Sequence, residues 1–332
     1  MASVKLLILH SDVTVAAKEN RAALHQNVSA GHQDVMRLLL PLSSVSTVDK
    51  SGKSSLHDAA ECGDVECFKC LLPLSSVNAP NDDGKTALHV IASRGHIEIT
   101  RLLLLFASTG SRDKEKCIPL HSCTLHGHSD VVEYLLPYSS TSSTTRRGRA
   151  SPHLSAYRGQ LEVAGVILPH SVPLIRDTRG DTALHLGAYF RHCKVIRLVL
   201  PYSEADTQNN SGSTTLVYSL KGYRKRLNEQ GESDKGSSKR TDTLVRDDIE
   251  MIKLLSLHSD VNIPDDDDLT ALHVSTSTGQ LDITKSLLPL FSVSTVDKSG
   301  KSWLHCAAER GNVDCFKFPL HLSSVNAQDV NG

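Results

Sequence analysis

Apolar and polar positions form blocks of helical length along most of the chain, and the same order of blocks returns with a fixed period of about 32 residues. Each unit opens with a polar turn, continues into an apolar segment at helical spacing, breaks at a Gly and resumes with a second apolar segment. In the unit that begins at Asp49, residues 54–60 form the predicted first helix, Gly63 the break and residues 65–72 the second helix. A fixed period of this length predicts stacked helix pairs rather than one closed core.

A nine-residue phrase marks the turn and the start of each first helix, and its clearest copy runs from Asn81 to His89. The His that ends the phrase recurs with the period at His25, His57, His89, His121, His153, His185, His273 and His305. Val217 stands in its place in the seventh unit, and the step from there to His273 is much longer than one period. The repeat pattern therefore resumes after an insertion between Val217 and His273. The insertion is as long as the difference between this step and one period.

The units resemble the ankyrin repeat. That family's unit of roughly 33 residues has a β-turn, a Thr-Pro-Leu-His-x-Ala helix start, a Gly break and a second helix. Residues 54–60, with the sequence Ser-Ser-Leu-His-Asp-Ala-Ala, match the helix start. The resemblance implies an all-α fold, an ankyrin-type helical solenoid with short β-turn or hairpin arms, and binding of a protein on its concave surface.

The repeats account for essentially the whole chain. We predict a half repeat at 1–16, nine repeats over 17–328 and the start of a tenth at 329–332. The nine begin near Ala17, Asp49, Asn81, Asp113, Thr145, Asp177, Asn209, Asp265 and Asp297. Because both ends interrupt a repeat, we interpret the chain as a fragment of a longer array.

Two local features affect the predicted geometry. The second helix usually runs into a Pro, as at Pro73 and Pro137, which cannot continue the hydrogen-bond ladder. Gly84 lies where the arm turns toward the first helix, so we expect a positive φ there. The corresponding positions hold Asn20, Lys116 and Asp268.

The inserted segment falls within the seventh repeat, at 223–246, between its two helices. This segment is charged and rich in Ser, and it contains few apolar side chains. Since it cannot offset its ordering entropy by burial, we expect a disordered insertion.

Composition narrows the classes of partner. Lys and Arg number 36 and Asp and Glu 37, so no global field attracts nucleic acid, and no apolar run has the length for membrane insertion. The eight Cys are scattered through the repeats, which favours a reducing compartment over a disulfide framework. We therefore expect a cytoplasmic protein, with the nucleus as the alternative.

Several motifs resemble catalytic or ligand sites without completing them. The Gly-Lys-Ser or Gly-Lys-Thr tripeptides at 52–54, 84–86 and 300–302 lack the Gly that a phosphate-binding loop needs five positions earlier. The spacing of the richest His and Cys cluster, at 117–128, does not match a structural zinc site, and the Asp run at 265–268 lacks the pattern of a calcium loop. We expect no catalytic residue, cofactor, metal or small-molecule substrate.

Candidate binding residues come from the first helices of the fifth and sixth repeats. By the resemblance, the residue after the phrase His and the two before the Gly face the concave side. In these repeats the positions hold Leu154, Tyr157, Arg158, Leu186, Tyr189 and Phe190. Tyr, Phe and Arg are enriched at interface hot spots. The alternative is that these rings pack over the arms between repeats.

The sequence thus predicts a non-catalytic scaffold or adaptor that binds another protein, whose identity the residues do not indicate. A different class fits the same repeats: a regulatory or targeting segment of a larger enzyme or channel whose catalytic part lies outside this chain.

Overall fold

A computed structural model gives the fold and describes residues 22–172, 174–230, 238–278, 281–291, 295–309 and 311. The chain divides into two compact units, which are described separately. Unit 1 comprises Met1–Leu154 and Gly165–Ser171, and unit 2 comprises Ser155–Ala164 and Val172–Gly332. The predicted half repeat at 1–16 and the start of a tenth repeat at 329–332 lie outside the described residues.

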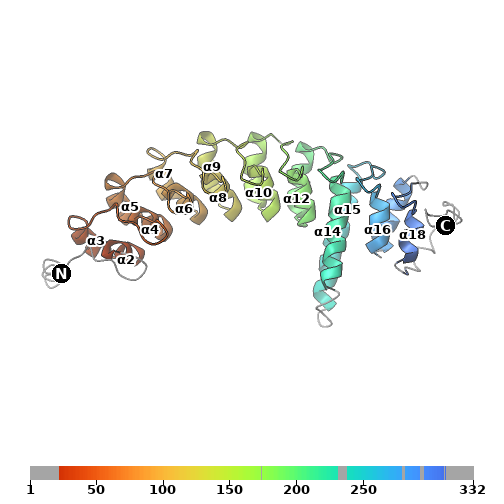
Figure 1. Ribbon diagram of the computed structural model, residues 1–332, viewed down its shortest axis with the longest axis horizontal. Helices are drawn as coiled ribbons and strands as arrows, with labels where there is room; N and C mark the ends of the chain where they lie inside the picture. The colour runs from red at the N-terminus through yellow and green to blue at the C-terminus, as the bar shows by residue number, and fades with distance from the viewer. Residues whose placement is uncertain are drawn as a thin grey trace. The chain divides into compact units, whose positions relative to one another are not determined.

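Unit 1 is built from short helix pairs. Its helices are α2 (Ala23–Ser29), α3 (Gln33–Leu39), α4 (Ser55–Cys62), α5 (Val65–Leu71), α6 (Ala87–Arg94), α7 (Ile97–Leu103), α8 (Pro119–His126) and α9 (Ser129–Leu135), with single 3-10 turns η2 (Leu72–Leu74), η3 (Leu136–Tyr138) and η4 (Leu168–His170). The first helices α4, α6 and α8 pack in one row and the second helices α5, α7 and α9 in another (Figure 1). The unit boundary passes through α10 (Ser151–Arg158) and α11 (Leu161–Ile167).

Unit 2 continues the same design. Its helices are α12 (Ala183–Tyr189), α13 (Cys193–Val199), α14 (Thr215–Gln230), α15 (Ser238–Ser256), α16 (Ala271–Thr278), α17 (Leu281–Leu287) and α18 (Trp303–Glu309), with 3-10 turns η5 (Leu200–Tyr202) and η6 (Leu288–Leu290). The first helices α12, α14, α16 and α18 pack in sequence, and α15 packs against α13 and α17. The all-α prediction is confirmed. The count of nine repeats stays a prediction, since the second helix that would follow α18 lies outside the described residues.

The phrase His joins its repeat to the next arm through a hydrogen bond from Nε2 at His25, His57, His89, His121 and His185. In the third repeat, the backbone N–H of Thr86 donates to Nδ1 of His89 over 3.1 Å. Nδ1 is therefore unprotonated, and Nε2–H donates to the carbonyl of Cys117, 28 residues away, over 3.0 Å. One buried ring thus caps its own helix and ties that helix to the following arm.

The arms turn as predicted. Gly84 has φ +79°, and Lys116 and Asp268 adopt the same left-handed conformation at φ 59° and 57°. The prediction for Gly84 is confirmed, while Asn20 lies outside the described residues. The backbone N–H of Asp82 donates to the carbonyl of Ser51 over 2.9 Å, which joins neighbouring arms. Lys116 and Asp268 show that a side chain can occupy this turn at some cost in strain.

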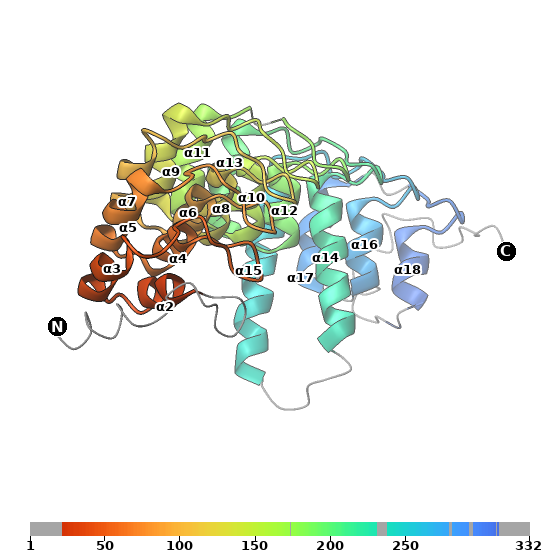
Figure 2. The same cartoon turned by 60° about the vertical axis from the view of Figure 1, so that its left-hand side comes forward.

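The insertion differs from expectation. Residues 223–230 extend α14 and residues 238–246 begin α15, so the expected disordered insertion at 223–246 is wrong for these two stretches. Residues 231–237 lie outside the described part of the chain. Figure 2 shows the two long helices side by side. Burial explains the difference: Tyr223 is only 2% exposed, so the insertion begins with a ring that the helix pair covers.

Candidate protein-interaction surface

Four rings form a continuous row across three first helices of unit 2. Tyr157, near the end of α10, meets Phe190 edge-on, with 4.7 Å between ring centroids. Phe190 meets Tyr189 at 5.1 Å, and Tyr189 meets Tyr218 of α14 at 4.9 Å. We call Tyr157, Phe190, Tyr189 and Tyr218 the aromatic row. Edge-to-face and tilted pairs at these distances are favourable beyond the apolar area they bury.

The predicted residues Tyr157, Arg158, Tyr189 and Phe190 are gathered and partly exposed, as expected. Phe190 is 38% exposed, Tyr157 and Tyr189 are half-buried and Arg158 is exposed. The guanidinium carbon of Arg158 lies over the ring of Tyr157, 5.4 Å from its centroid, in cation–π geometry. Tyr157 pairs with Phe190 rather than with Tyr189, its counterpart one period away. The role of these residues in binding a partner stays a prediction.

Leu154 and Leu186 need a correction. They are 4% and 2% exposed, so the expectation that they project onto the binding face is wrong. Asp58 and Val90, which also follow the phrase His, are buried as well. The position therefore faces the core between first helices rather than solvent.

Tyr218 belongs to the row, and sequence reasoning missed it. It lies one period after Leu186, so extending the same register into the seventh repeat would have found it. Its hydroxyl donates to a carboxylate oxygen of Asp181 over 3.1 Å. Burial, together with the nearby Asp181 charge, raises the pKa of Tyr218 to about 12, so the phenol stays protonated.

The long helix α14 positions the row from one side. At Gly222 an added Cβ would lie 2.9 Å from the ring of Tyr189, so the absence of a side chain makes room for that ring. Arg226, one turn further along, donates to the carbonyl of Tyr189 over 2.7 Å. The extension of α14 beyond a normal first helix thus supports the row directly.

A buried charge cluster joins α14 and α15 to the turn after α12. Nε of Arg191 lies 2.6 Å from Oδ1 of Asp248, and Nη2 of Arg226 lies 3.6 Å from the same oxygen. Burial raises the pKa of Asp248, against the opposing effect of the two arginines. Because the three residues come from three elements, the cluster fixes the helix pair beside the aromatic row.

Arg191 also explains a departure from the repeat pattern. It stands three periods after Gly95, at a turn where both residues have positive φ, 69° and 78°. A Cβ on Gly95 would collide with the ring of His128, whereas Arg191 extends its side chain to Asp248 of α15. The ion pair helps to offset the strain of a left-handed non-glycine residue.

Comparison with known families agrees with this geometry. A family model described as ankyrin repeats matches three stretches, residues 2–80, 59–147 and 244–329, which together cover most of the chain. The chain belongs to the ankyrin-repeat family. The stretch between the matches, 148–243, contains the aromatic row and most of the insertion. A comparison with curated proteins found none that matches.

The ankyrin repeats of unit 1 present a different first-helix face. A groove of about 610 Å³ lies between the first helices and the arms, and its lining includes Lys53, Glu61, Arg94 and Glu115. Lys53 lies 2.8 Å from Glu61, which also accepts from Arg94. The hydrogen bond from Lys53 lowers the pKa of Glu61, with Arg94 acting in the same direction. The charges on this face largely pair with one another.

The His and Cys cluster of the fourth ankyrin repeat has a structural arrangement. His121 accepts from the backbone N–H of Ile118 and bonds through Nε2 to the carbonyl of Ser143 over 2.9 Å. Burial raises the pKa of the Cys123 thiol, which disfavours a thiolate. Across the described residues, no group of three or more His, Cys, Asp or Glu side chains is placed to hold a metal ion. Nor does any described helix combine the length and apolar character needed to cross a bilayer.

Proposed function

We propose that this chain is a non-catalytic scaffold that binds another protein through the first-helix face of its ankyrin repeats, the concave face of the family. Ankyrin repeats generally mediate protein–protein interaction. One observation carries the proposal: the aromatic row and Arg158 form one contiguous, partly exposed surface on adjacent first helices. Aromatic and Arg side chains are the usual anchors of interfaces, and aromatic rings bury a large area at small entropic cost.

The proposed compartment is reducing, cytoplasmic or nuclear. Among the described residues, Cys67, Cys70, Cys117, Cys123, Cys193 and Cys306 have free thiols. Such thiols persist where glutathione and thioredoxin keep cysteines reduced.

The test begins with a partner identified by proximity labelling and then purified. The variant Arg158→Ala/Phe190→Ala removes the two most exposed anchors, and we expect the affinity to fall about 30-fold, or roughly 2 kcal/mol. Tyr189 is a poorer target, because its ring packs against Gly222 and Tyr218 and its loss would also affect the fold. Isothermal titration calorimetry gives the dissociation constant and differential scanning fluorimetry the melting temperature.

Unit 1 offers a matched control. Arg101 lies over the ring of Tyr134 at 5.7 Å, and Phe106 is 60% exposed, so Arg101→Ala/Phe106→Ala removes the same two residue types from second helices and their loops. We expect this control to bind the partner as the unmodified chain does. Equal affinity of both double variants would refute the proposed surface. A lowered melting temperature with unchanged affinity would assign the rings to packing instead.

A further inference from the structure

Three carboxylates close to the aromatic row lie beneath the surface. Asp181, Asp248 and Asp265 are all buried. Asp181 accepts from Tyr218 and Asn209, Asp248 pairs with Arg191, and Asp265 lies 2.5 Å from Nζ of Lys221. These negative charges are therefore satisfied within the chain and lie out of reach of a partner.

The Arg158 cation beside the same rings is placed differently. Arg158 is exposed, and its contact is the face of Tyr157, with no ion pair to any other described side chain. Arg226 donates to the carbonyl of Tyr189 over 2.7 Å, but it also lies 3.6 Å from Asp248, so its charge is compensated within the chain. The surface that a partner meets thus combines rings with the positive charge of Arg158.

From this juxtaposition we propose that the aromatic row receives an acidic segment of the partner protein. One carboxylate of the segment pairs with the Arg158 guanidinium, and an apolar side chain packs on Phe190 and Tyr157. A guanidinium held over a ring keeps its outer N–H groups directed to solvent, where they suit bidentate pairing with a carboxylate. This inference rests on the proposed function and specifies the chemistry of the partner.

A protein segment fits these observations better than a nucleic acid does. Continuous phosphate backbones are bound by several cations arranged along a groove. The chain has a formal net charge of −1, and the arm that precedes α16 exposes Asp266, Asp267 and Asp268. A short run of carboxylates separated by apolar residues needs only the local positive charge at Arg158.

The test uses three labelled peptides of the same length, built from Glu-Gly-Phe, Gln-Gly-Phe and Lys-Gly-Phe repeats, and a labelled oligothymidylate. Fluorescence anisotropy with the full chain gives each affinity at low and at high salt. We expect the Glu peptide to bind about tenfold more tightly than the Gln peptide at low salt, and the difference to shrink as salt screens the charges. The Lys peptide should bind weakest.

Substitutions of Arg158 and of a matched arginine complete the design. Arg158→Glu should abolish the preference for the Glu peptide, and Arg158→Gln should reduce it, while Arg101→Glu, the matched cation–π arginine of unit 1, should leave it unchanged. Equal binding of the Glu and Gln peptides, or no binding of the Glu peptide, overturns the inference. The inference is also overturned, in favour of nucleic acid, if the oligothymidylate binds more tightly than the Glu peptide and Arg158→Glu abolishes that binding. If peptide preference is absent but the identified partner still loses affinity in Arg158→Ala/Phe190→Ala, the proposed function stands and only its acidic specificity falls.

Discussion

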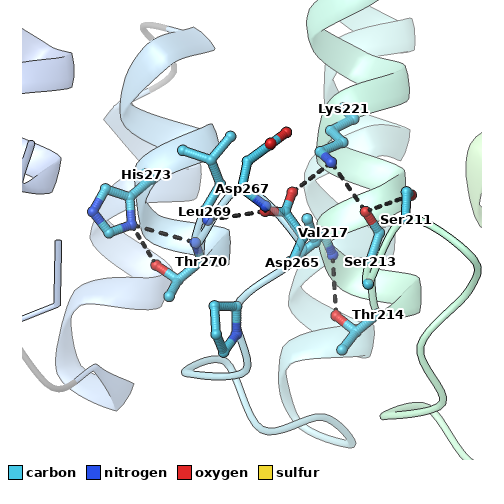
Figure 3. A network of polar contacts seen from close by, with 12 residues as sticks. Ser211, Ser213, Thr214, Val217, Lys221, Asp265, Asp267, Leu269, Thr270 and His273 are labelled. Carbon is cyan, nitrogen blue, oxygen red and sulfur yellow. Dashed lines mark hydrogen bonds and ion pairs between the residues drawn. The ribbon is translucent and has the colours of Figure 1, made fainter. Parts of the chain in front are cut away.

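The third and seventh ankyrin repeats are tied to their following arms by different chemistry. In the third repeat a buried neutral imidazole makes the link, from His89 to the carbonyl of Cys117. In the seventh repeat Val217 fills the His position and offers no polar group. Lys221, one turn further along α14, makes the link instead: its Nζ lies 2.5 Å from Asp265 and 3.0 Å from Ser213 (Figure 3).

The two links differ in how far their polar groups are withdrawn from water. The imidazole of His89 is buried, and it makes both of its hydrogen bonds in only one neutral tautomer. Burial lowers the pKa of His89, because it disfavours the charged form of the ring. The Lys221 side chain remains partly exposed, while the Asp265 carboxylate is buried and also accepts backbone N–H groups of its own turn. The third and seventh repeats thus tie helix to arm through different polar residues.

The largest expected effect comes from giving the third repeat the residue of the seventh. His89→Val removes the cap on Thr86 and leaves the carbonyl of Cys117 without its partner, and Ser93 stands where the seventh repeat has its Lys. We expect a loss of about 2–3 kcal/mol in the free energy of unfolding, because buried polar groups lose their hydrogen bonds. Urea titration followed by circular dichroism measures it. His258→Val, at an exposed position, serves as the control, and a similar small change in both variants would contradict the role of the tie.

Acid should weaken the imidazole ties. Burial lowers the pKa of His121 to about 4, and those of His57, His89 and His185 also fall below 6.5. Since the unfolded chain then binds protons more readily, the stability present above pH 6.5 is lost as the pH falls toward 4. The lowered pKa of His121 alone should reduce the free energy of unfolding by about 2 kcal/mol at about pH 5.

Denaturant titrations at neutral pH and at about pH 5 measure this loss. In this range the carboxyls of Asp49, Glu61 and Asp64, whose pKa values are lowered, stay ionised. His89→Val should show a shallower decline than the unmodified chain. A midpoint that does not move between the two pH values would mean that the rings are not held neutral.

The smallest effect should come from the ion pair of the seventh repeat. Asp265→Asn keeps the turn, since Asn81 accepts the same two backbone bonds in its own arm, but it removes the charge that Lys221 faces. We expect a loss of about 1–2 kcal/mol, because Lys221 retains access to water. Asp113→Asn is the control, because Asp113 accepts the same backbone bonds in its own turn and no described Lys pairs with it. This variant should leave the free energy of unfolding nearly unchanged. Equal losses in both would assign the effect to the turn. Thermal unfolding of both variants compares them.

The binding surface was predictable only in part. The register correctly placed Tyr157, Arg158, Tyr189 and Phe190 together on one face, because residues one period apart occupy equivalent positions on adjacent helices. The register did not distinguish Leu154 and Leu186, which face the core, from the exposed residues of the same helices. That distinction depends on how neighbouring helices rotate and pack.

Local chemistry is what the sequence by itself determined. The apolar spacing, the Gly breaks and the His phrase specify helix pairs and turns, since each depends on φ, capping and periodicity within a few residues. Tertiary structure alone decided the seventh repeat. Its low apolar content predicted disorder, yet Arg226 at its start and Asp248 just after its end lie 3.6 Å apart, and Arg191, 57 residues before Asp248, pairs with the same carboxylate. Such a contact depends on where two distant segments lie in space, and no local pattern of residues encodes that distance.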